Sequence, residues 1–306
     1  IIPIRYSDRI KIMKWRNEQL FHLRQKELLN LKIQNVYFKD VILKLFENKN
    51  PKQILFSYLH KGKLLGYGGL VHIDWTNLNA EISFIMDTSL EKKYFNLHWT
   101  NFLKLLEKPA FLILGFSKIY TYAFDLRNHL YHCLETNNYV KEARLQKHVR
   151  FDNDFIDVVI HSKINPFTLR SANANKKDCL TLFEWVNEKT VRENSLNSKK
   201  ITLTEHKKWY YDKLKDPNVK IYILVYMDKD VAQIRFQNND NEQLIDYSVQ
   251  YQYRGQGFGK AILMLGMNKL NSKNYVGYVK NSNISSLKTF SSIGFKIVYK
   301  DDIVTK

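Results

Sequence analysis

The chain has 306 residues, of which 44% are hydrophobic and 14% aromatic, and a formal net charge of +18 at pH 7. At roughly 100–200 residues per domain this length predicts two domains, and the apolar content excludes a globally disordered chain. No segment approaches the ~18 consecutive apolar residues of a membrane helix, and the first residues lack the pattern of a signal peptide. We therefore expect no membrane insertion and a cytoplasmic location.

The two cysteines, Cys133 and Cys179, occur without a CxxC pair. This pattern argues against a disulfide framework and against a structural zinc site, so we predict no bound metal. Only 11 of the 48 basic residues are Arg, and the Lys residues are spread along the chain, which favours a solvated lysine surface. The alternative is a field that attracts polyanionic small ligands, whereas the absence of nucleic-acid-binding motifs predicts no nucleic-acid partner.

One pattern occurs twice, 170 residues apart. Trp15 followed by Asn17 and Glu18 returns as Trp185 followed by Asn187 and Glu188. The repeat is too long for a solenoid unit and predicts two related domains. Proline and polar residues near Asn165-Pro166 mark the boundary, which divides the chain into residues 1–163 and 164–306. We expect a monomer built as a pseudo-dimer of these domains, with a homodimer as the alternative.

Periodicity and capping signals predict mixed helices and strands in the second half. The predicted elements are helices at 177–188, 204–214, 259–271 and 284–293, and strands at 221–227, 231–238, 244–251 and 275–279. Strands in meander order, then interrupted by a helix, predict an α+β fold of three layers (αβα). We expect each domain to be a mostly antiparallel mixed sheet with helices on both faces.

A glycine-rich loop at residues 251–261 follows a strand and opens a helix. Its three glycines, Gly255, Gly257 and Gly259, expose successive backbone N–H groups at a helix N-terminus, where a diphosphate can approach without meeting a Cβ atom. A dinucleotide fold would place such a loop after its first strand, and a P-loop would end in Gly-Lys-Ser/Thr. Neither description fits this position or sequence.

Two motifs together resemble the GNAT acyltransferase superfamily. The run from Val249 through Arg254-Gly255-Gln256-Gly257-Phe258-Gly259 resembles its acyl-CoA loop, and Asn283, Ser286, Phe290 and Gly294-Phe295 resemble the helix that follows. The resemblance is strong over residues 167–299 and weak over the first half. The residues that it implies at the acyl-CoA are Val249, Tyr251, Arg254, Gly255, Gln256, Gly257, Phe258, Gly259, Lys260, Asn283, Ser286 and Phe290.

The resemblance also implies a mechanism. The co-substrate is acyl-CoA, carrying acetyl or a short hydroxyacyl group, and pantetheine lies in a gap where a bulge parts the strand ending at Val249 from its neighbour. Amides from Gln256 to Lys260 would hold the pyrophosphate, and a backbone N–H near Val249 would polarise the thioester carbonyl. An amine then attacks directly, because Cys179 lies on an apolar helix face where we expect core rather than a nucleophile.

The sequence offers more than one candidate for the catalytic acid and base. Many family members have Tyr where this chain has Phe290, so the thiolate leaves without that proton donor. Asp246 is the first candidate for the base, Glu242 the second and His206 the third. Water is the alternative, since an amine with a reference pKa near 8 loses its proton readily.

The acceptor region resembles GNAT enzymes that acylate amino groups of UDP- or dTDP-linked sugars for bacterial O-antigen or capsule. In this interpretation Arg192 and Arg235 bind a diphosphate, Asn194 and His206 bond sugar hydroxyls, and Trp209 and Tyr247 stack. Alternatively the tryptophans are core, and Arg192 caps a helix or pairs with Glu188. Two further hypotheses are a ribosomal-protein type N-terminal acetyltransferase and a binding protein without activity.

The first half departs from the family pattern. Residues 86–94 follow the equivalent strand without any glycine, and Glu91 would repel phosphate. We expect this domain to keep the fold, lose acyl-CoA binding, and complete the acceptor cleft or replace a subunit. The rival hypothesis is a separate ligand contacted by Tyr120, Tyr122, Arg127 and His129.

Overall fold

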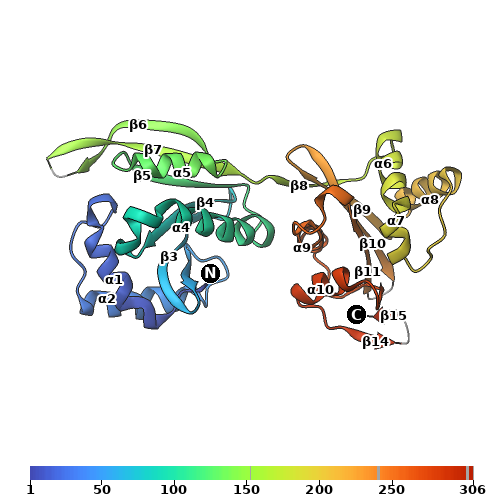
Figure 1. The fold of residues 1–306 in the computed structure, drawn as a ribbon, viewed down its shortest axis with the longest axis horizontal. Coiled ribbons are helices and arrows are strands. Elements are labelled where there is room, and N and C mark those ends of the chain that lie inside the picture. Colours follow the sequence, from blue (N-terminus) through green and yellow to red (C-terminus); the bar gives the residue numbers. More distant parts are fainter. Residues whose placement is uncertain (152, 240–241, 301–302, 306) are drawn as a thin grey trace. The chain divides into compact units, whose positions relative to one another are not determined.

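The computed structural model describes residues 1–151, 153–239, 242–300 and 303–305. Two compact units make up the chain, an N-terminal unit of Ile1–Asn165 and a C-terminal unit of Pro166–Lys306 (Figure 1).

The N-terminal unit is built on one seven-stranded sheet of order β1-β2-β3-β4-β5-β7-β6. All neighbouring strands are antiparallel except β4 and β5, which are parallel. The strands are β1 (Ile2–Pro3), β2 (Ile54–His60), β3 (Lys63–Asp74), β4 (Asn79–Met86), β5 (Lys118–Phe124), β6 (Val140–Phe151) and β7 (Asp154–Ile164). The α-helices are α1 (Arg9–Glu18), α2 (Leu31–Tyr37), α3 (Leu43–Leu45), α4 (Thr88–Lys108) and α5 (Asn128–Thr136). Short 3₁₀ turns at Tyr6–Asp8 and Leu20–His22 and π turns at Phe38–Ile42 and Pro109–Ile113 join them.

Alternating residues of β4 explain why helices cover both faces of this sheet. Successive side chains of a strand point to opposite faces. Ile85 belongs to the apolar cluster that contains Trp15 of α1. Its neighbour Phe84 stacks on Phe102 of α4 with ring centroids 4.0 Å apart, and meets Trp99 edge-on.

The C-terminal unit repeats this plan with a five-stranded sheet of order β12-β11-β10-β9-β8 and a small second sheet of order β13-β15-β14. The strands are β8 (Phe167–Ser171), β9 (Val219–Tyr226), β10 (Lys229–Asn239), β11 (Glu242–Val249), β12 (Tyr275–Val276), β13 (Val279–Lys280), β14 (Val298–Lys300) and β15 (Ile303–Thr305). The helices are α6 (Lys176–Asn187), α7 (Lys189–Asn194), α8 (Leu203–Lys215), α9 (Phe258–Leu270) and α10 (Ile284–Ser292), with a 3₁₀ turn at Tyr251–Tyr253.

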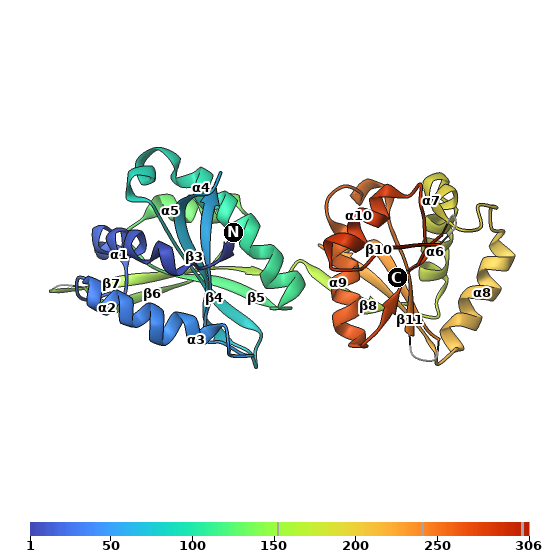
Figure 2. The ribbon, with the colours of Figure 1, turned by 90° about the horizontal axis from the view of Figure 1, so that it is seen from below.

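Helices lie on both faces of this sheet as well (Figure 2). Ile221 and Ile223 of β9 pack with α6 and α8 on one face. On the other face Ile234 and Phe236 of β10 approach Gly266 of α9, where a Cβ atom would lie 3.1 Å from each of them. The predicted α+β fold of three layers is confirmed.

The predicted elements of this unit are confirmed to within a few residues, with one exception. The predicted strand 275–279 is two short strands, β12 and β13, which belong to different sheets. Gly277 separates them, and a Cβ atom there would lie 2.9 Å from Cζ of Phe290. The ring of Phe290 therefore occupies the space that a side chain at position 277 would need. Thr202 and Glu205 form the predicted capping box of α8.

The repeated tryptophan and asparagine have the same surroundings in both units. Trp15 and Trp185 are both buried. Asn17 bonds both the N–H and the C=O of Leu29, each at 2.8 Å, and Asn187 bonds the same two groups of Ile201, each at 2.9 Å. Each asparagine thus anchors the loop that follows the first helix of its unit.

We expect Asn187→Ala to lower the free energy of unfolding by about 1–3 kcal/mol, because the backbone groups of Ile201 lose their partner. Asn17→Ala should have the same effect through Leu29. Urea unfolding of the full chain measures both. Asn50→Ala, at an exposed asparagine, is the control and should change stability by less than about 0.5 kcal/mol. Equal stability of Asn187→Ala and the control would contradict the anchoring role.

Candidate functional site

A gap opens in the sheet of the C-terminal unit beside the end of β11. β11 and β12 are parallel partners only at Gln243 with Tyr275 and at Leu244 with Val276. β11 then continues to Val249, whereas the chain after Val276 turns away into another sheet. The expected bulge in β11 is wrong: its register with β10 runs unbroken from Val249 to Glu242. The gap arises because the partner strand ends.

The backbone of Val249 faces this gap. The N–H of the next residue, Gln250, donates to the C=O of Val231 on the β10 side. Because successive residues of a strand direct their polar groups to opposite edges, the N–H and C=O of Val249 point away from β10. The C=O accepts a bond of 3.0 Å from Nε of Arg254, which confirms that direction.

The glycine loop leads directly into the N-terminus of α9. Gly257 is the N-cap at φ 90°, a left-handed conformation, and no side chain caps the helix. Ala261 makes the first intrahelical bond, to the C=O of Gly257 at 3.0 Å, so the N–H groups of Phe258, Gly259 and Lys260 precede the helical ladder. A Cβ atom at position 257 would meet nothing within 4 Å. These N–H groups and the helix dipole give the loop the positive potential that an anion site requires.

Arg254 organises this loop. Beside its bond to Val249, its Nη2 pairs with the carboxylate of Glu188, which also caps α7 through Thr190 and Val191. The guanidinium thereby ties the end of β11 to the start of α7. Burial acts to raise the pKa of Glu188, but the hydrogen bond and the charge of Arg254 help to bring that pKa below its usual value.

Helix α10 forms the opposite wall. Asn283 caps the helix by accepting a bond from the N–H of Ser286. The hydroxyl of Tyr247 donates to Oγ of Ser286 at 3.3 Å, and its ring packs edge-on against Phe290. Burial raises the pKa of Tyr247, so its hydroxyl stays protonated. A cavity of about 810 Å³ lies among β11, the glycine loop, α7 and α10.

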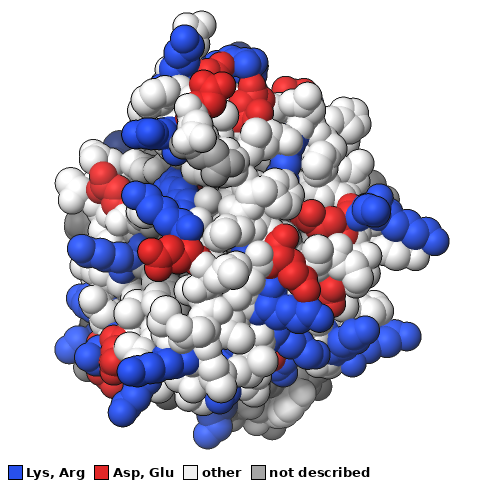
Figure 3. Space-filling model, turned by 90° about the vertical axis from the view of Figure 1, so that its left-hand side faces the viewer, with Lys and Arg blue, Asp and Glu red and all other residues white. Residues whose placement is uncertain are grey.

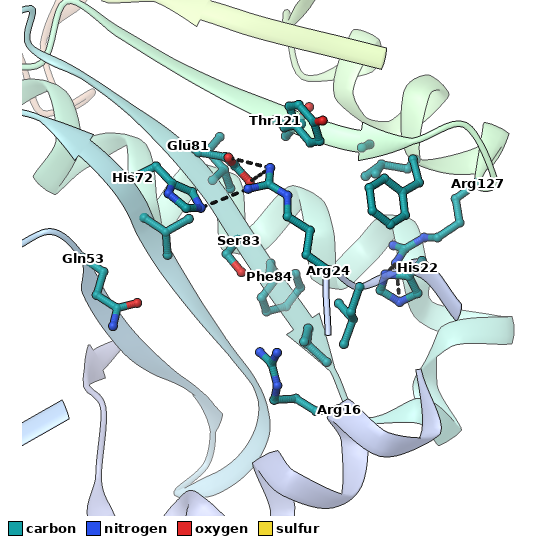
Figure 4. A pocket seen from close by; sticks show the side chains of 18 of the residues that line it. Arg16, His22, Arg24, Gln53, His72, Glu81, Ser83, Phe84, Thr121 and Arg127 are labelled. Carbon is teal, nitrogen blue, oxygen red and sulfur yellow. Dashed lines mark hydrogen bonds and ion pairs between the residues drawn. The ribbon is translucent and has the colours of Figure 1, made fainter. Parts of the chain in front are cut away.

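The N-terminal unit has the same gap, and one of its own side chains lies across the start of it. β4 and β5 are parallel partners only from Asn79 to Glu81, and both strands continue beyond. Arg24 binds both carboxylate oxygens of Glu81 on β4 at 2.8 Å (Figure 4). Its guanidinium lies 4.0 Å from the ring centroid of Tyr122 on β5. Arg24 therefore bridges the two strands where they part.

The helix that follows this gap is closed to anions. Asp87 is the N-cap of α4, and its carboxylate accepts bonds from the N–H of Ser89 at 3.0 Å and from its hydroxyl at 2.8 Å. Glu91 adds a second carboxylate in the first turn. The contrast with the uncapped α9 follows from the residue at the cap, which is Asp in one unit and Gly in the other.

Comparison with protein families gives a match over residues 1–160 to a model described as an acetyltransferase (GNAT) domain. The chain belongs to the GNAT acetyltransferase family. It is an acyl-CoA-dependent N-acyltransferase, and its co-substrate is acyl-CoA. The match falls on the N-terminal unit, where we expected the weaker resemblance.

Solved structures similar to this GNAT chain include spermidine N-acetyltransferase from Vibrio cholerae in complex with CoA and spermine. That structure is 16% identical with a TM-score of 0.47, and the match covers 53% of this chain and 93% of the other. A dodecameric structure of the Vibrio cholerae enzyme in an intermediate state is 17% identical with a TM-score of 0.45, over 54% and 92% of the two chains. A comparison with curated proteins finds no match.

Most of the residues expected at the acyl-CoA line the cavity of the C-terminal unit. They are Val249, Arg254, Gly255, Gly257, Gly259, Lys260, Asn283, Ser286 and Phe290. The other three side chains lie elsewhere. Tyr251 is 70% exposed, Gln256 bonds the C=O of Gln252, and Phe258 is buried against Tyr226. For these three positions only the backbone remains a candidate contact.

Asp246 lies on the cavity wall, with 55% of its side chain exposed. Nε2 of Gln233 donates to it at 3.2 Å, and the guanidinium of Arg235 lies 3.5 Å away. Glu242 does not line the cavity. It begins β11, roughly 20 Å from Val249 at about 3.3 Å per residue, so the expectation that it serves as a base is wrong.

His206 is buried in the core of the unit rather than in the cavity. Only 2% of it is exposed, and its Nε2 lies 3.0 Å from the C=O of Cys179. The rings of Phe183 and Tyr210 pack beside it, and burial lowers its pKa. The proposed roles of His206 as a base and as a sugar ligand are therefore wrong, because the buried face of α8 carries it. Cys179 is buried as expected.

The remaining acceptor candidates divide into two groups. Arg235, Tyr247, Arg192 and Asn194 line the cavity. The guanidinium of Arg192, however, donates hydrogen bonds to the C=O groups of Val186, Asn197 and Lys199 and to Oγ of Ser195. It holds a loop together, so the expected diphosphate contact through its guanidinium is wrong.

Two acceptor candidates, Asn194 and Trp209, already have partners within the unit. The amide of Asn194 donates to the C=O of Thr190. Trp209 packs against the cluster beneath α8, and the guanidinium of Arg235 covers its ring at 5.2 Å. The expected stacking face of Trp209 is therefore already occupied.

Several cavity residues were not expected. They include Tyr253, Tyr278, Ser285, Lys288, Thr289 and Ser292. Helical spacing from Ser286 to Thr289 and from Ser285 to Ser292 was a usable signal for α10, because residues three, four and seven apart share a face. Tyr278 carried no such signal, since it lies between β12 and β13.

On the face shown in Figure 3, Lys and Arg side chains are widely spread with Asp and Glu side chains among them. Within the described ranges, no group of three or more His, Cys, Asp or Glu side chains is placed to hold a metal ion. No helix in the part of the chain that the structure describes has the length and apolarity to cross a membrane.

Proposed function

We propose that the C-terminal unit is the catalytic centre and that it transfers an acyl group from acyl-CoA to the amino group of a nucleotide-linked sugar. The observation that carries the first part is the contrast between the units. In the C-terminal unit the helix N-terminus beside the gap is uncapped and borders the cavity. In the N-terminal unit Asp87 caps the helix, and Arg24 lies across the start of the gap.

The residues around the gap suit each part of acyl-CoA. The N–H groups of Phe258, Gly259 and Lys260 would hold the pyrophosphate, as helix N-termini do for phosphate groups. The edge of β11 that β12 leaves unpaired offers backbone bonds to pantetheine. The N–H of Val249 would lie against the thioester carbonyl and stabilise the negative charge that develops on its oxygen.

The reaction needs one bond made and one broken. The amine nitrogen attacks the carbonyl carbon, the carbon–sulfur bond breaks, and CoA leaves as the thiolate. Asp246, on the cavity wall, would accept the proton of the amine. The thiolate then takes a proton from water or from Tyr247, whose hydroxyl lies in the cavity where Phe290 has none.

The charge of the cavity favours an acceptor that is itself anionic. Its cationic lining residues are Arg192, Arg235, Arg254, Lys260 and Lys288, whereas the only carboxylate among the described lining residues is Asp246. A polyamine such as spermine, which is named with the Vibrio cholerae enzyme, would meet mostly like charge here. A diphosphate beside Arg235 would instead meet opposite charge. This acceptor would place the enzyme in the synthesis of bacterial O-antigen or capsule.

A thiol-release assay tests the acceptor class. Acetyl-CoA and hydroxybutanoyl-CoA are each offered with UDP- and dTDP-linked amino sugars, the same sugars without nucleotide, spermidine, and a peptide with a free N-terminus. We expect kcat/KM for one nucleotide-linked sugar to exceed that of its free sugar at least about tenfold, since one charge-assisted contact contributes roughly 1.5–3 kcal/mol. Preference for the peptide or spermidine would replace this acceptor with that class.

A further inference from the structure

The N-terminal unit contains a second large cavity, of about 730 Å³, which residues of both parted strands, β4 and β5, line. We call it the Arg127 cavity. Its cationic lining residues are Arg16, Arg24, Lys52 and Arg127, and its one carboxylate among the described lining residues is Glu81. Arg24 already binds both oxygens of Glu81. The other three cations therefore face the cavity without a carboxylate in its wall.

Arg127 is the most deeply buried of these cations. Only 6% of it is exposed, and its Nε has no hydrogen-bond partner. Its Nη1 lies 2.7 and 3.0 Å from the two ring nitrogens of His22 (Figure 4). Burial and the neighbouring Arg127 lower the pKa of His22 to about 3, so the imidazole is neutral at ordinary pH and supplies no negative charge.

The nearest carboxylate compensates this charge only weakly. Oε1 of Glu91 is 4.0 Å from Nη1 of Arg127, and the guanidinium also lies 5.1 Å from the ring centroid of Phe95. A buried guanidinium with an unsatisfied N–H costs stability unless an anion pairs with it. Proteins retain such costs where a residue has a task in binding.

We propose that the Arg127 cavity binds a small acid through its oxyanion, a carboxylate or a phosphate, which pairs with the guanidinium of Arg127. The planar fork of a guanidinium matches both groups. Arg16 and Gln53 also line the cavity, and Figure 4 shows both extending toward it. The N-terminal unit is then a ligand-binding module, a role that is separate from the transfer proposed for the C-terminal unit.

The occupant is not a second acyl-CoA. The carboxylate of Asp87 occupies the helix N-terminus that would hold a pyrophosphate, and the guanidinium of Arg24 crosses the gap between Glu81 and Tyr122. A small acid needs neither of these places, because Arg127 lies on the cavity wall.

Calorimetry and thermal melting of the full chain test this proposal with inorganic phosphate and citrate as separate probes. The measurements use the Gly257→Glu background, which removes the anion site proposed for the other unit. We expect saturable millimolar binding of at least one probe, and the probe that binds identifies the oxyanion. Arg127→Lys should weaken that binding about tenfold, because it keeps the charge and loses the fork.

A second variant separates a binding role from a structural one. Arg127→Met should abolish the binding and raise the melting temperature of the free protein by about 2–4 °C, since it removes a poorly compensated buried charge. Arg150→Gln, at an exposed arginine of the same unit outside the cavity, is the control and should leave both measurements unchanged. The proposal is overturned if neither probe binds at tens of millimolar, if binding persists in Arg127→Met, or if that variant melts lower.

Discussion

Gly257→Glu should reduce the affinity for acetyl-CoA by about 100-fold or more, with the fold retained. A carboxylate at this position blocks the uncapped amides of α9 and repels the pyrophosphate; losing two charge-assisted bonds costs about 3–6 kcal/mol at roughly 1.5–3 kcal/mol each. The fold tolerates the side chain because a Cβ atom there meets nothing within 4 Å. Calorimetry with acetyl-CoA measures the affinity, and circular dichroism checks the fold.

Two further variants isolate the effect of charge. Gly257→Ala carries the same backbone strain at φ 90° without the carboxylate, and should lose much less affinity. Gly62→Glu places the same side chain at φ 79° in the β2–β3 turn of the other unit, also in open space, and should bind acetyl-CoA normally. Normal affinity of Gly257→Glu would show that acyl-CoA is bound elsewhere in the chain.

Asp246→Asn should lower kcat by about 100-fold and change KM much less, because a positioned base typically contributes 10²–10⁴-fold to a rate. The amide has nearly the shape of the carboxylate and can still bond Gln233, so loss of the proton acceptor dominates. Steady-state kinetics with the best acceptor from the thiol-release assay measure both constants. The loss should shrink as pH rises and more of the amine is already deprotonated.

Glu242→Gln is the matched control, since it makes the equivalent change on the same strand at the end remote from the cavity. It should react at the rate of the unchanged enzyme. A normal kcat for Asp246→Asn would instead mean that water deprotonates the amine, as the reference pKa of such groups allows.

Features that depend on neighbours in sequence were readable before the fold. The helix that starts after Gly257 and the capping box of Thr202 and Glu205 each involve groups within a few residues of one another. The same holds for the absence of glycine around Asp87. Local sterics and hydrogen bonds decide such features, so sequence patterns predict them well.

Roles that depend on which face of an element is buried, or on how a loop folds back, were not readable. His206 and Asp246 are both polar residues on regular elements, yet one is in the core and the other on the cavity wall. Arg192 is a cation whose donors are consumed by carbonyl groups of a nearby loop. Composition cannot show whether a guanidinium already has its bonds, because packing sets the distance to each acceptor.

The amino-acid order alone determined the family motif, the elements that carry it and the uncapped helix N-terminus where an anion can bind. Tertiary structure decided which of two similar gaps a side chain crosses. That outcome depends on Arg24 meeting Glu81, 57 residues away along the chain. The tertiary structure also buries Arg127 beside a neutral His22, and these two residues in contact are 105 positions apart in the chain. Contacts over such separations form only when the sheet and its helices come together, and no local pattern records them.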